Sequence, residues 1–382
     1  MRSIVLTALS TLISVAWTLA PATATAALPA TEARITDLDA LVQRGTETLL
    51  KHDFETALAI GRKAQLLAPG ASRPLGIMVD ALLELGRYEE AGETLEAMLL
   101  ARPDLSSYSR LSYYHELNGR VDLAIEAMER ALRAGGSTPT ETEIVRVLLG
   151  DLWLLEGQPD RAAGLYRTAL AAMPQNLKAR SGLARAAAAE GDLHTAQAHL
   201  QEAIRITALP ELITQLADIE ALLDDAGSAD TLYLVAAELE RYHGAGSATA
   251  EPFGVLLETD HGDIGLALRR AYEGYEAAPS IGAADALAWA LRANGQIAEA
   301  HALAREALRT GTQSPVILYH AGVISAEAGN AVDARALLEQ GLHRSAAASP
   351  GLASQIREAL VGLPTASRWS GRAAGAVSVQ PR

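Results

Sequence analysis

The stretch Gly86-Arg87-Tyr88-Glu89-Glu90-Ala91 separates two apolar runs of the chain. Glycine readily adopts the left-handed backbone conformation that ends a helix, so Gly86 predicts a helix C-terminus. Ala91 and Leu95 then lie at helical spacing and share one face of a second helix. Pro103 ends the unit because proline cannot continue a helix. The stretch therefore predicts the turn of a helical hairpin.

The spacing from the turn glycine to a small residue five positions later recurs along the chain. The further copies are Gly119/Ala124, Gly157/Ala162, Gly191/Ala196, Gly262/Ala267, Gly295/Ala300 and Gly329/Ala334, and an earlier copy has His52 in the turn and Ala57 after it. Successive turn residues are 33 to 38 apart, except for an interval of 71 between Gly191 and Gly262. That interval is about two periods, so a degenerate copy is predicted near Asp225. A fixed period in this range predicts a solenoid of stacked helix pairs.

In these features the chain resembles the tetratricopeptide repeat, which has Leu-Gly in its first helix and small and aromatic residues in its second. The best single match is Leu149-Gly150 followed by Gly157, Ala162, Tyr166 and Pro174. The first-helix tryptophan of the motif is missing from every copy, although Trp153 and Trp289 occur later in first helices. The resemblance covers about residues 37–346 and extends to exported bacterial repeat proteins. It implies an all-α fold, a right-handed superhelix of eight to nine helix pairs.

The composition excludes several classes of function. The chain has 382 residues and no cysteine, which rules out disulfides, thiolate catalysis and cysteine-ligated metals. Its net charge of −14 argues against general nucleic-acid binding, which depends on basic side chains that neutralise phosphates. Apolar residues make up 49% and aromatic residues only 4% of the chain, so alanine and leucine must supply the core.

The two ends of the chain differ from the repeats. Residues 1–26 have the three parts of a secretory signal: Arg2, an apolar run over 4–20 and the small-residue pattern Ala24-Thr25-Ala26. An uncleaved membrane anchor is the alternative. Residues 27–243 and 244–366 are predicted to be two repeat arrays, the second ending in a capping helix around residues 355–360. Residues 367–382 are predicted to be a disordered tail.

No cofactor or metal site is predicted, and no catalytic motif is found. Asp260-His261-Gly262-Asp263 places three polar groups around one turn, where two carboxylates could hold a cation. Calcium loops supply more oxygen ligands than this, so a turn followed by a helix N-cap is the favoured interpretation. A hydrolase or metal-dependent enzyme with a site at Asp260, His261 and Asp263 stays as the alternative function.

The favoured candidate is a surface rather than a catalytic site. First helices line the concave side of such a solenoid and form an extended binding surface. The residues predicted on their exposed stripe are Arg73, Asp80, Tyr113, Asp151, Arg185, Asp285, Trp289, Arg292 and Tyr319. Trp289 and Tyr319 are expected to form a binding anchor with Arg292, because tryptophan, tyrosine and arginine dominate the energetics of interfaces. This expectation requires Trp289 to be at least partly exposed.

Together these observations predict a non-catalytic scaffold of the bacterial cell envelope, periplasmic or secreted. It would bind a segment of another protein in its concave groove, without binding nucleic acid and without membrane insertion once the signal is removed. A structural spacer in an envelope assembly is a further alternative.

Overall fold

The computed structural model describes residues 30–244 and 251–363, and every regular element in these ranges is a helix. The predicted signal segment and the predicted tail therefore lie outside the described residues. None of the described helices is long and apolar enough to cross a membrane.

Within the described ranges the helices form nine successive pairs and one final single helix. The N-terminal pairs are α2 (Ala30–Leu50) with α3 (Phe54–Leu67), α4 (Ser72–Glu84) with α5 (Tyr88–Ala101), α6 (Leu105–Leu117) with α7 (Val121–Ala134), α8 (Pro139–Leu155) with α9 (Pro159–Ala172), and α10 (Leu177–Ala189) with α11 (Leu193–Ile206). The C-terminal pairs are α12 (Pro210–Leu222) with α13 (Ala226–Gly244), α14 (Pro252–His261) with α15 (Ile264–Ala277), α16 (Ile281–Ala293) with α17 (Ile297–Ala307), and α18 (Pro315–Glu327) with α19 (Ala331–Ala348), followed by α20 (Pro350–Gly362). The predicted α-solenoid is confirmed, and the degenerate copy near Asp225 is the pair α12–α13.

The turns inside the pairs lie at the predicted positions, and all but one of the predicted turn residues have the expected left-handed backbone conformation. Backbone φ is positive at six of the predicted turn glycines, and also at His52 (60°) and Asp224 (62°), the two copies that lack glycine. Gly262 differs because its φ is −133°. The buried Glu258 carboxylate lies beside this turn and accepts a hydrogen bond of 2.8 Å from the Asp263 backbone N–H. The Glu258 side chain therefore stabilises this turn without a left-handed glycine.

The small residues of the second helices confirm the register most directly. Each of the predicted alanines has 0% relative exposure, namely Ala91, Ala124, Ala162, Ala196, Ala267, Ala300 and Ala334. A larger side chain at these contacts would have to displace the facing helix.

We expect Ala162→Leu to destabilise the protein by about 1–3 kcal/mol, because overpacking forces side chains and backbone out of position. Ala171→Leu is the matched control, since Ala171 is exposed on the same helix α9. Thermal unfolding of both variants measures the difference. Equal melting temperatures for the two variants would show that the repeat register is wrong.

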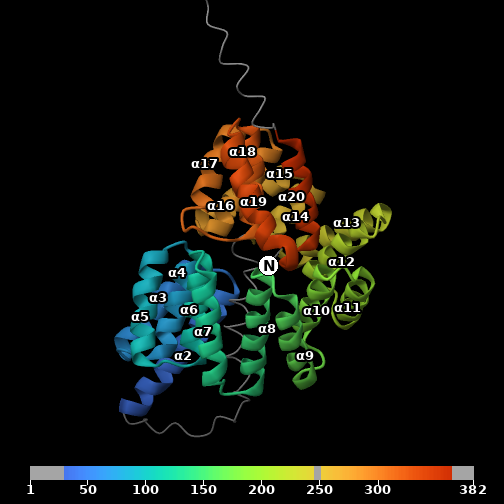
Figure 1. The fold of residues 1–382 in the computed structure, drawn as a ribbon. Helices are drawn as coiled ribbons and strands as arrows, with labels where there is room; N and C mark the ends of the chain where they lie inside the picture. Colours follow the sequence, from blue (N-terminus) through green and yellow to red (C-terminus); the bar gives the residue numbers. More distant parts are fainter. Residues whose placement is uncertain (1–29, 245–250, 364–382) are drawn as a thin grey trace, which may run out of the picture.

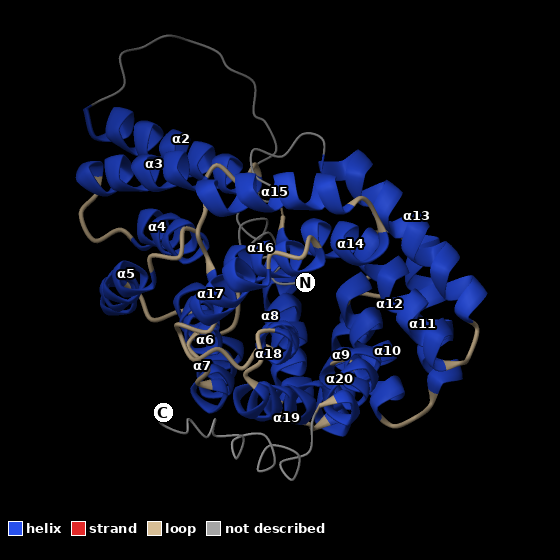
Figure 2. Cartoon of the chain, turned by 90° about the horizontal axis from the view of Figure 1, so that it is seen from above, coloured by secondary structure: helices blue, strands red, loops and turns tan. Residues whose placement is uncertain are grey.

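The superhelix turns far enough for its C-terminal pairs to stack on its N-terminal pairs (Figure 1). Viewed along the axis, the helices follow one another around a ring (Figure 2). Residues about 193 positions apart meet where the two layers touch. The Tyr88 hydroxyl accepts a hydrogen bond of 2.9 Å from the Ile281 N–H, and the Thr310 hydroxyl donates one of 2.6 Å to the Leu117 carbonyl. We call this contact the closure of the superhelix.

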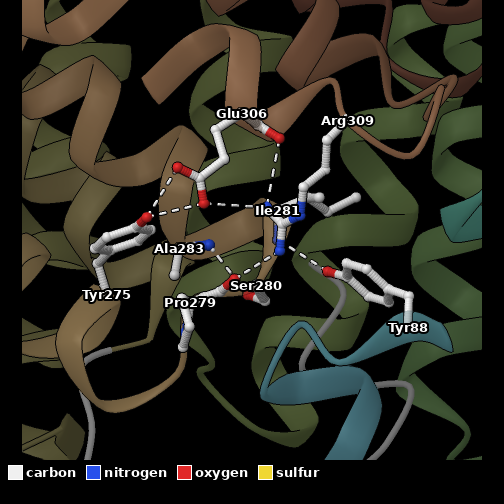
Figure 3. A network of polar contacts seen from close by, with 8 residues as sticks. All are labelled: Tyr88, Tyr275, Pro279, Ser280, Ile281, Ala283, Glu306 and Arg309. Carbon is white, nitrogen blue, oxygen red and sulfur yellow. Dashed lines mark hydrogen bonds and ion pairs between the residues drawn. The ribbon is translucent and has the colours of Figure 1, made fainter. Parts of the chain in front are cut away.

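Figure 3 shows the part of the closure around Tyr88. Arg309 lies over the Tyr88 ring, 5.3 Å from its centroid, and donates a hydrogen bond of 2.7 Å to the Pro279 carbonyl. A Cβ atom added at Gly86 would lie 2.3 Å from that carbonyl oxygen. The turn glycine at position 86 is therefore required twice, for its positive φ and for the close approach of the second layer.

Further along, α19 contacts α8 and α10, and α20 contacts α10 and α12. Arg344 on α19 forms an ion pair with Glu156 at the end of α8, and Ala347 joins the apolar cluster of Val147 and Ala186. Part of the surface of these first helices is therefore covered by the chain itself.

The division into two repeat arrays predicted at residue 244 stays a prediction. Limited proteolysis between residues 244 and 250 would test it.

Candidate functional site

The polar side chains along the first helices pair with one another across neighbouring repeats. Side chains separated by one repeat form hydrogen bonds or ion pairs across neighbouring first helices, at Asp39–Arg73, Asp80–Arg110, Asp151–Arg185, Asp285–His320 and Arg292–Glu327. The sequence separations are 30 to 35 residues. Residues predicted to contact a partner protein thus contact the next repeat.

The Asp80–Arg110 pair is the most buried of these contacts. The guanidinium donates two hydrogen bonds to the carboxylate, at 2.8 and 2.6 Å, and the side chains are 1% and 3% exposed. Burial raises the pKa of Asp80 despite the opposing effect of Arg110. The pair therefore holds α4 against α6 and is not available to a ligand. By contrast, Arg73 and Asp39 are both half exposed, so their pair is expected to contribute little to stability.

Asp151 and Arg185 belong to a network with Tyr166. The Asp151 carboxylate accepts hydrogen bonds from Arg185, at 2.5 Å, and from the Tyr166 hydroxyl, at 2.7 Å. The Tyr166 ring is fully buried between Gly150 and Gly182, where an added Cβ atom would lie 2.5 Å from ring atoms. Burial and the Asp151 charge raise the pKa of Tyr166. Arg185 and Asp151 stay partly exposed, so this network can still face a bound molecule.

The prediction that Trp289 is an exposed binding anchor is wrong. The side chain is only 5% exposed, and its indole N–H donates a hydrogen bond of 2.7 Å to Asp260. The ring stacks on His320 at 4.1 Å between centroids, while Arg292 lies over it at 4.4 Å. Trp289 therefore packs between repeats, with His320 of the adjacent first helix α18 stacked on its ring and Arg292 of its own helix α16 over it.

Two more predicted groove residues are buried as well. Tyr113 is 6% exposed and Asp285 is 3% exposed, with the Asp285 carboxylate 2.9 Å from Nδ1 of His320. Their prediction as exposed groove residues is wrong for the same physical reason, since first helices one period apart lie too close to leave these positions open. Tyr319 and Arg292 keep part of their surface exposed.

The residues of the alternative enzymatic site have separate structural partners. Asp260 accepts the Trp289 indole N–H, His261 stacks on Tyr233 at 3.8 Å, and Asp263 caps α15 by accepting the Leu266 N–H at 2.9 Å. In the part of the chain that the structure describes, no group of three or more acidic, histidine or cysteine residues could hold a metal ion. The turn-and-cap interpretation thus accounts for this stretch.

A group of carboxylates that the sequence did not single out meets near the closure. We call Glu84, Glu211, Glu240 and Glu251 the acidic cluster; they come from α4, α12, α13 and the N-cap of α14. Burial raises the pKa of Glu84 to about 8, helped by the charge of Glu251. Burial also raises the pKa of Glu240 to about 7, with Glu211 adding to the effect. Three of these residues lie on or next to first helices, so the cluster places carboxyl groups on that side of the solenoid.

Family models of the tetratricopeptide repeat match residues 154–218 in one case and residues 78–139 and 286–352 in the other. Together these segments make up slightly more than half of the chain. The chain is a tetratricopeptide repeat protein. Proteins of this fold generally bind other proteins and act as non-catalytic interaction scaffolds. No curated protein matches the sequence.

Several solved structures are similar to this repeat protein at low sequence identity. One is PilW, described as a widely conserved type IV pilus biogenesis factor, at 21% identity, covering 52% of this chain and 90% of PilW with a TM-score of 0.45. PilF of Pseudomonas aeruginosa is 17% identical and covers 54% of this chain and 93% of its own, with a TM-score of 0.45. The Cut9–Hcn1 hetero-tetramer of the APC/C is 14% identical and covers 86% of this chain and 56% of its own, with a TM-score of 0.43.

Proposed function

We propose that this tetratricopeptide repeat protein is an exported scaffold of the bacterial cell envelope that binds a segment of another protein on the side lined by its first helices. The acidic cluster is the observation that carries the proposal. Its carboxylates are partly buried, and the charges of Glu251 and Glu211 add to burial in raising the pKa of Glu84 and Glu240, so a positively charged segment would favour their ionised forms. The partner class is therefore a protein segment with basic residues.

Export is supported by the N-terminal pattern of residues 1–26. We expect the native protein to begin near Ala27. Mass spectrometry of the protein purified from its own cells measures this terminus. Intact Met1 in a membrane fraction would instead indicate an uncleaved anchor.

The binding proposal is tested by affinity capture from an envelope extract. The bait is the mature chain, compared with a triple variant of the cluster, Glu84→Gln, Glu211→Gln and Glu251→Gln. The matched control is Glu89→Gln, Glu93→Gln and Glu96→Gln, which removes the same number of carboxyl groups from exposed positions of α5.

The proposal predicts a partner that binds the parent and the control, that is lost with the cluster variant, and that dissociates as the salt concentration rises. Equal capture by the cluster variant and the parent would contradict binding at the cluster. Failure of the parent to retain any partner would favour the structural spacer.

A further inference from the structure

The last helices of the chain cover part of the first helices of three earlier pairs. The second helices α3, α5, α7, α9 and α11 have 14 residues each, whereas α19 has 18. This longer helix contacts α8 and α10, and α20, which follows it after a break at Ser349, contacts α10 and α12. Repeat helices mainly contact their neighbours along a solenoid, so these contacts are additional to the stacking of the pairs.

The end of α19 binds α8 and α10 through one charged and one small side chain. Arg344 forms an ion pair with Glu156, the C-cap of α8, and both side chains are partly exposed. One turn later, Ala347 is buried in an apolar cluster with Val147 of α8 and Ala186 of α10. This face of the first helices therefore accepts a helix that carries a basic residue and a small residue three positions apart.

The start of α20 approaches α12 closely. A Cβ atom added at Gly351 would lie 3.2 Å from Cβ of Asp218 on α12. The Asp218 carboxylate is held in place by the Tyr233 hydroxyl, which donates a hydrogen bond of 2.7 Å to it. A bulky side chain at position 351 would therefore push α20 away from α12.

The attachment of α20 to α19 is firmer than its contact with these first helices. Ile356 of α20 has 0% exposure and packs in one cluster with Ala334 and Leu338 of α19. The contact with α8, α10 and α12 involves small side chains and a partly exposed ion pair, and exposed pairs contribute little to stability. The end of α19 and α20 can thus leave the face of α8, α10 and α12 together and keep their own packing.

Building on the scaffold function above, we propose that the partner binds the face of α8, α10 and α12 as a helix, and that the end of α19 and the start of α20 occupy this face as an internal ligand until the partner displaces them. Helices bound in this way are recognised through side chains at spacings of three, four and seven residues. Arg344, Ala347 and Gly351 have these spacings, so the partner's helix is expected to present a basic residue followed by small residues at the same spacings. Its basic residue would pair with Glu156, as Arg344 does.

A synthetic peptide of residues 340–359 with a fluorescent label serves as the probe, and fluorescence anisotropy measures its binding to the full chain. Two glycines of α20 provide matched variants: Gly351→Leu displaces α20 from α12, whereas Gly362→Leu adds the same side chain where nothing lies within 4 Å. We expect the peptide to bind Gly351→Leu with at least about tenfold higher affinity than Gly362→Leu, because an occupied face lowers the apparent affinity. A peptide with Ala347→Glu should lose this binding, and one with Ala346→Glu, an exposed position, should keep it.

An engineered disulfide tests the same point within one folded protein. The chain has no cysteine of its own, and the distance of 3.2 Å between an added Cβ atom at Gly351 and Cβ of Asp218 is close to the separation of about 3.5–4.5 Å in disulfides. Asp218→Cys with Gly351→Cys should therefore lock α20 on α12 when oxidised. We expect the oxidised protein to bind the peptide at least about tenfold more weakly than the same protein after reduction.

Equal binding by the oxidised and the reduced protein would overturn the proposal, and so would equal binding by Gly351→Leu and Gly362→Leu or no binding to the reduced protein. Because the peptide comes from this chain, the outcome does not depend on the capture experiment. A negative result with the peptide would leave a partner captured through the acidic cluster in place, whereas failure to capture a partner would leave the internal ligand in place.

Discussion

Replacing Arg110 by alanine is expected to destabilise the protein by about 3–5 kcal/mol, since this leaves the Asp80 carboxylate buried without its partner. Asp80 is 1% exposed, and in the parent it receives two hydrogen bonds from Arg110. Water cannot replace the guanidinium at such a position without opening the contact between α4 and α6. Chemical denaturation of the variant and the parent measures the loss.

Two variants make the interpretation specific. Arg73→Ala removes an arginine from the exposed Asp39–Arg73 pair, and we expect it to cost less than about 1 kcal/mol. The double variant Asp80→Leu with Arg110→Met should recover most of the stability that Arg110→Ala loses, because no buried charge is left. A loss below 1 kcal/mol for Arg110→Ala would show that the pair is not buried as described.

Replacing Tyr166 by alanine should have an effect of similar size, about 3–5 kcal/mol, because it removes a fully buried ring. The ring fills the space between Gly150 and Gly182, so its loss leaves a cavity between two first helices. Tyr166→Phe keeps the ring and removes only the hydroxyl that donates to Asp151, so about 1 kcal/mol is expected. If both variants lost the same stability in denaturation experiments, the hydrogen bond and not the packing would govern this site.

The local part of the fold could be predicted because each repeat carries its own signals. Gly86 and its equivalents mark turns through a backbone conformation that few residues adopt, and Ala162 marks a contact too close for larger side chains. The exception at Gly262 depends on the buried carboxylate of Glu258, whose position results from tertiary packing.

The binding stripe was predicted less well, because spacing alone does not distinguish exposed residues from residues that pair across repeats. Trp289 was expected to be exposed to solvent, but it packs against His320 of the next repeat. A usable signal was present in the sequence. Asp151 and Arg185 are 34 residues apart, and Arg292 and Glu327 are 35 apart, so opposite charges recur at one period. Such a pattern predicts pairing between adjacent first helices.

The closure could not be predicted from sequence patterns at all. It brings Tyr88 next to Ile281 and Leu117 next to Thr310, which are 193 residues apart in both cases. The sequence separation at which two layers come into contact depends on the pitch of the superhelix. The pitch results from the small rotations between successive pairs. The acidic cluster escaped prediction for the same reason, since Glu84 and Glu251 meet only when the second layer stacks on the first.

Small-angle X-ray scattering of the mature chain at pH 6 tests the central claim most directly, because the scaffold described here depends on a superhelix that closes on itself. A compact chain of this length has a radius of gyration of about 21 Å, and the closed solenoid is expected to lie slightly above this value. A radius well above this value, as for an extended array with separated layers, would contradict the closure and with it the meeting of the acidic cluster.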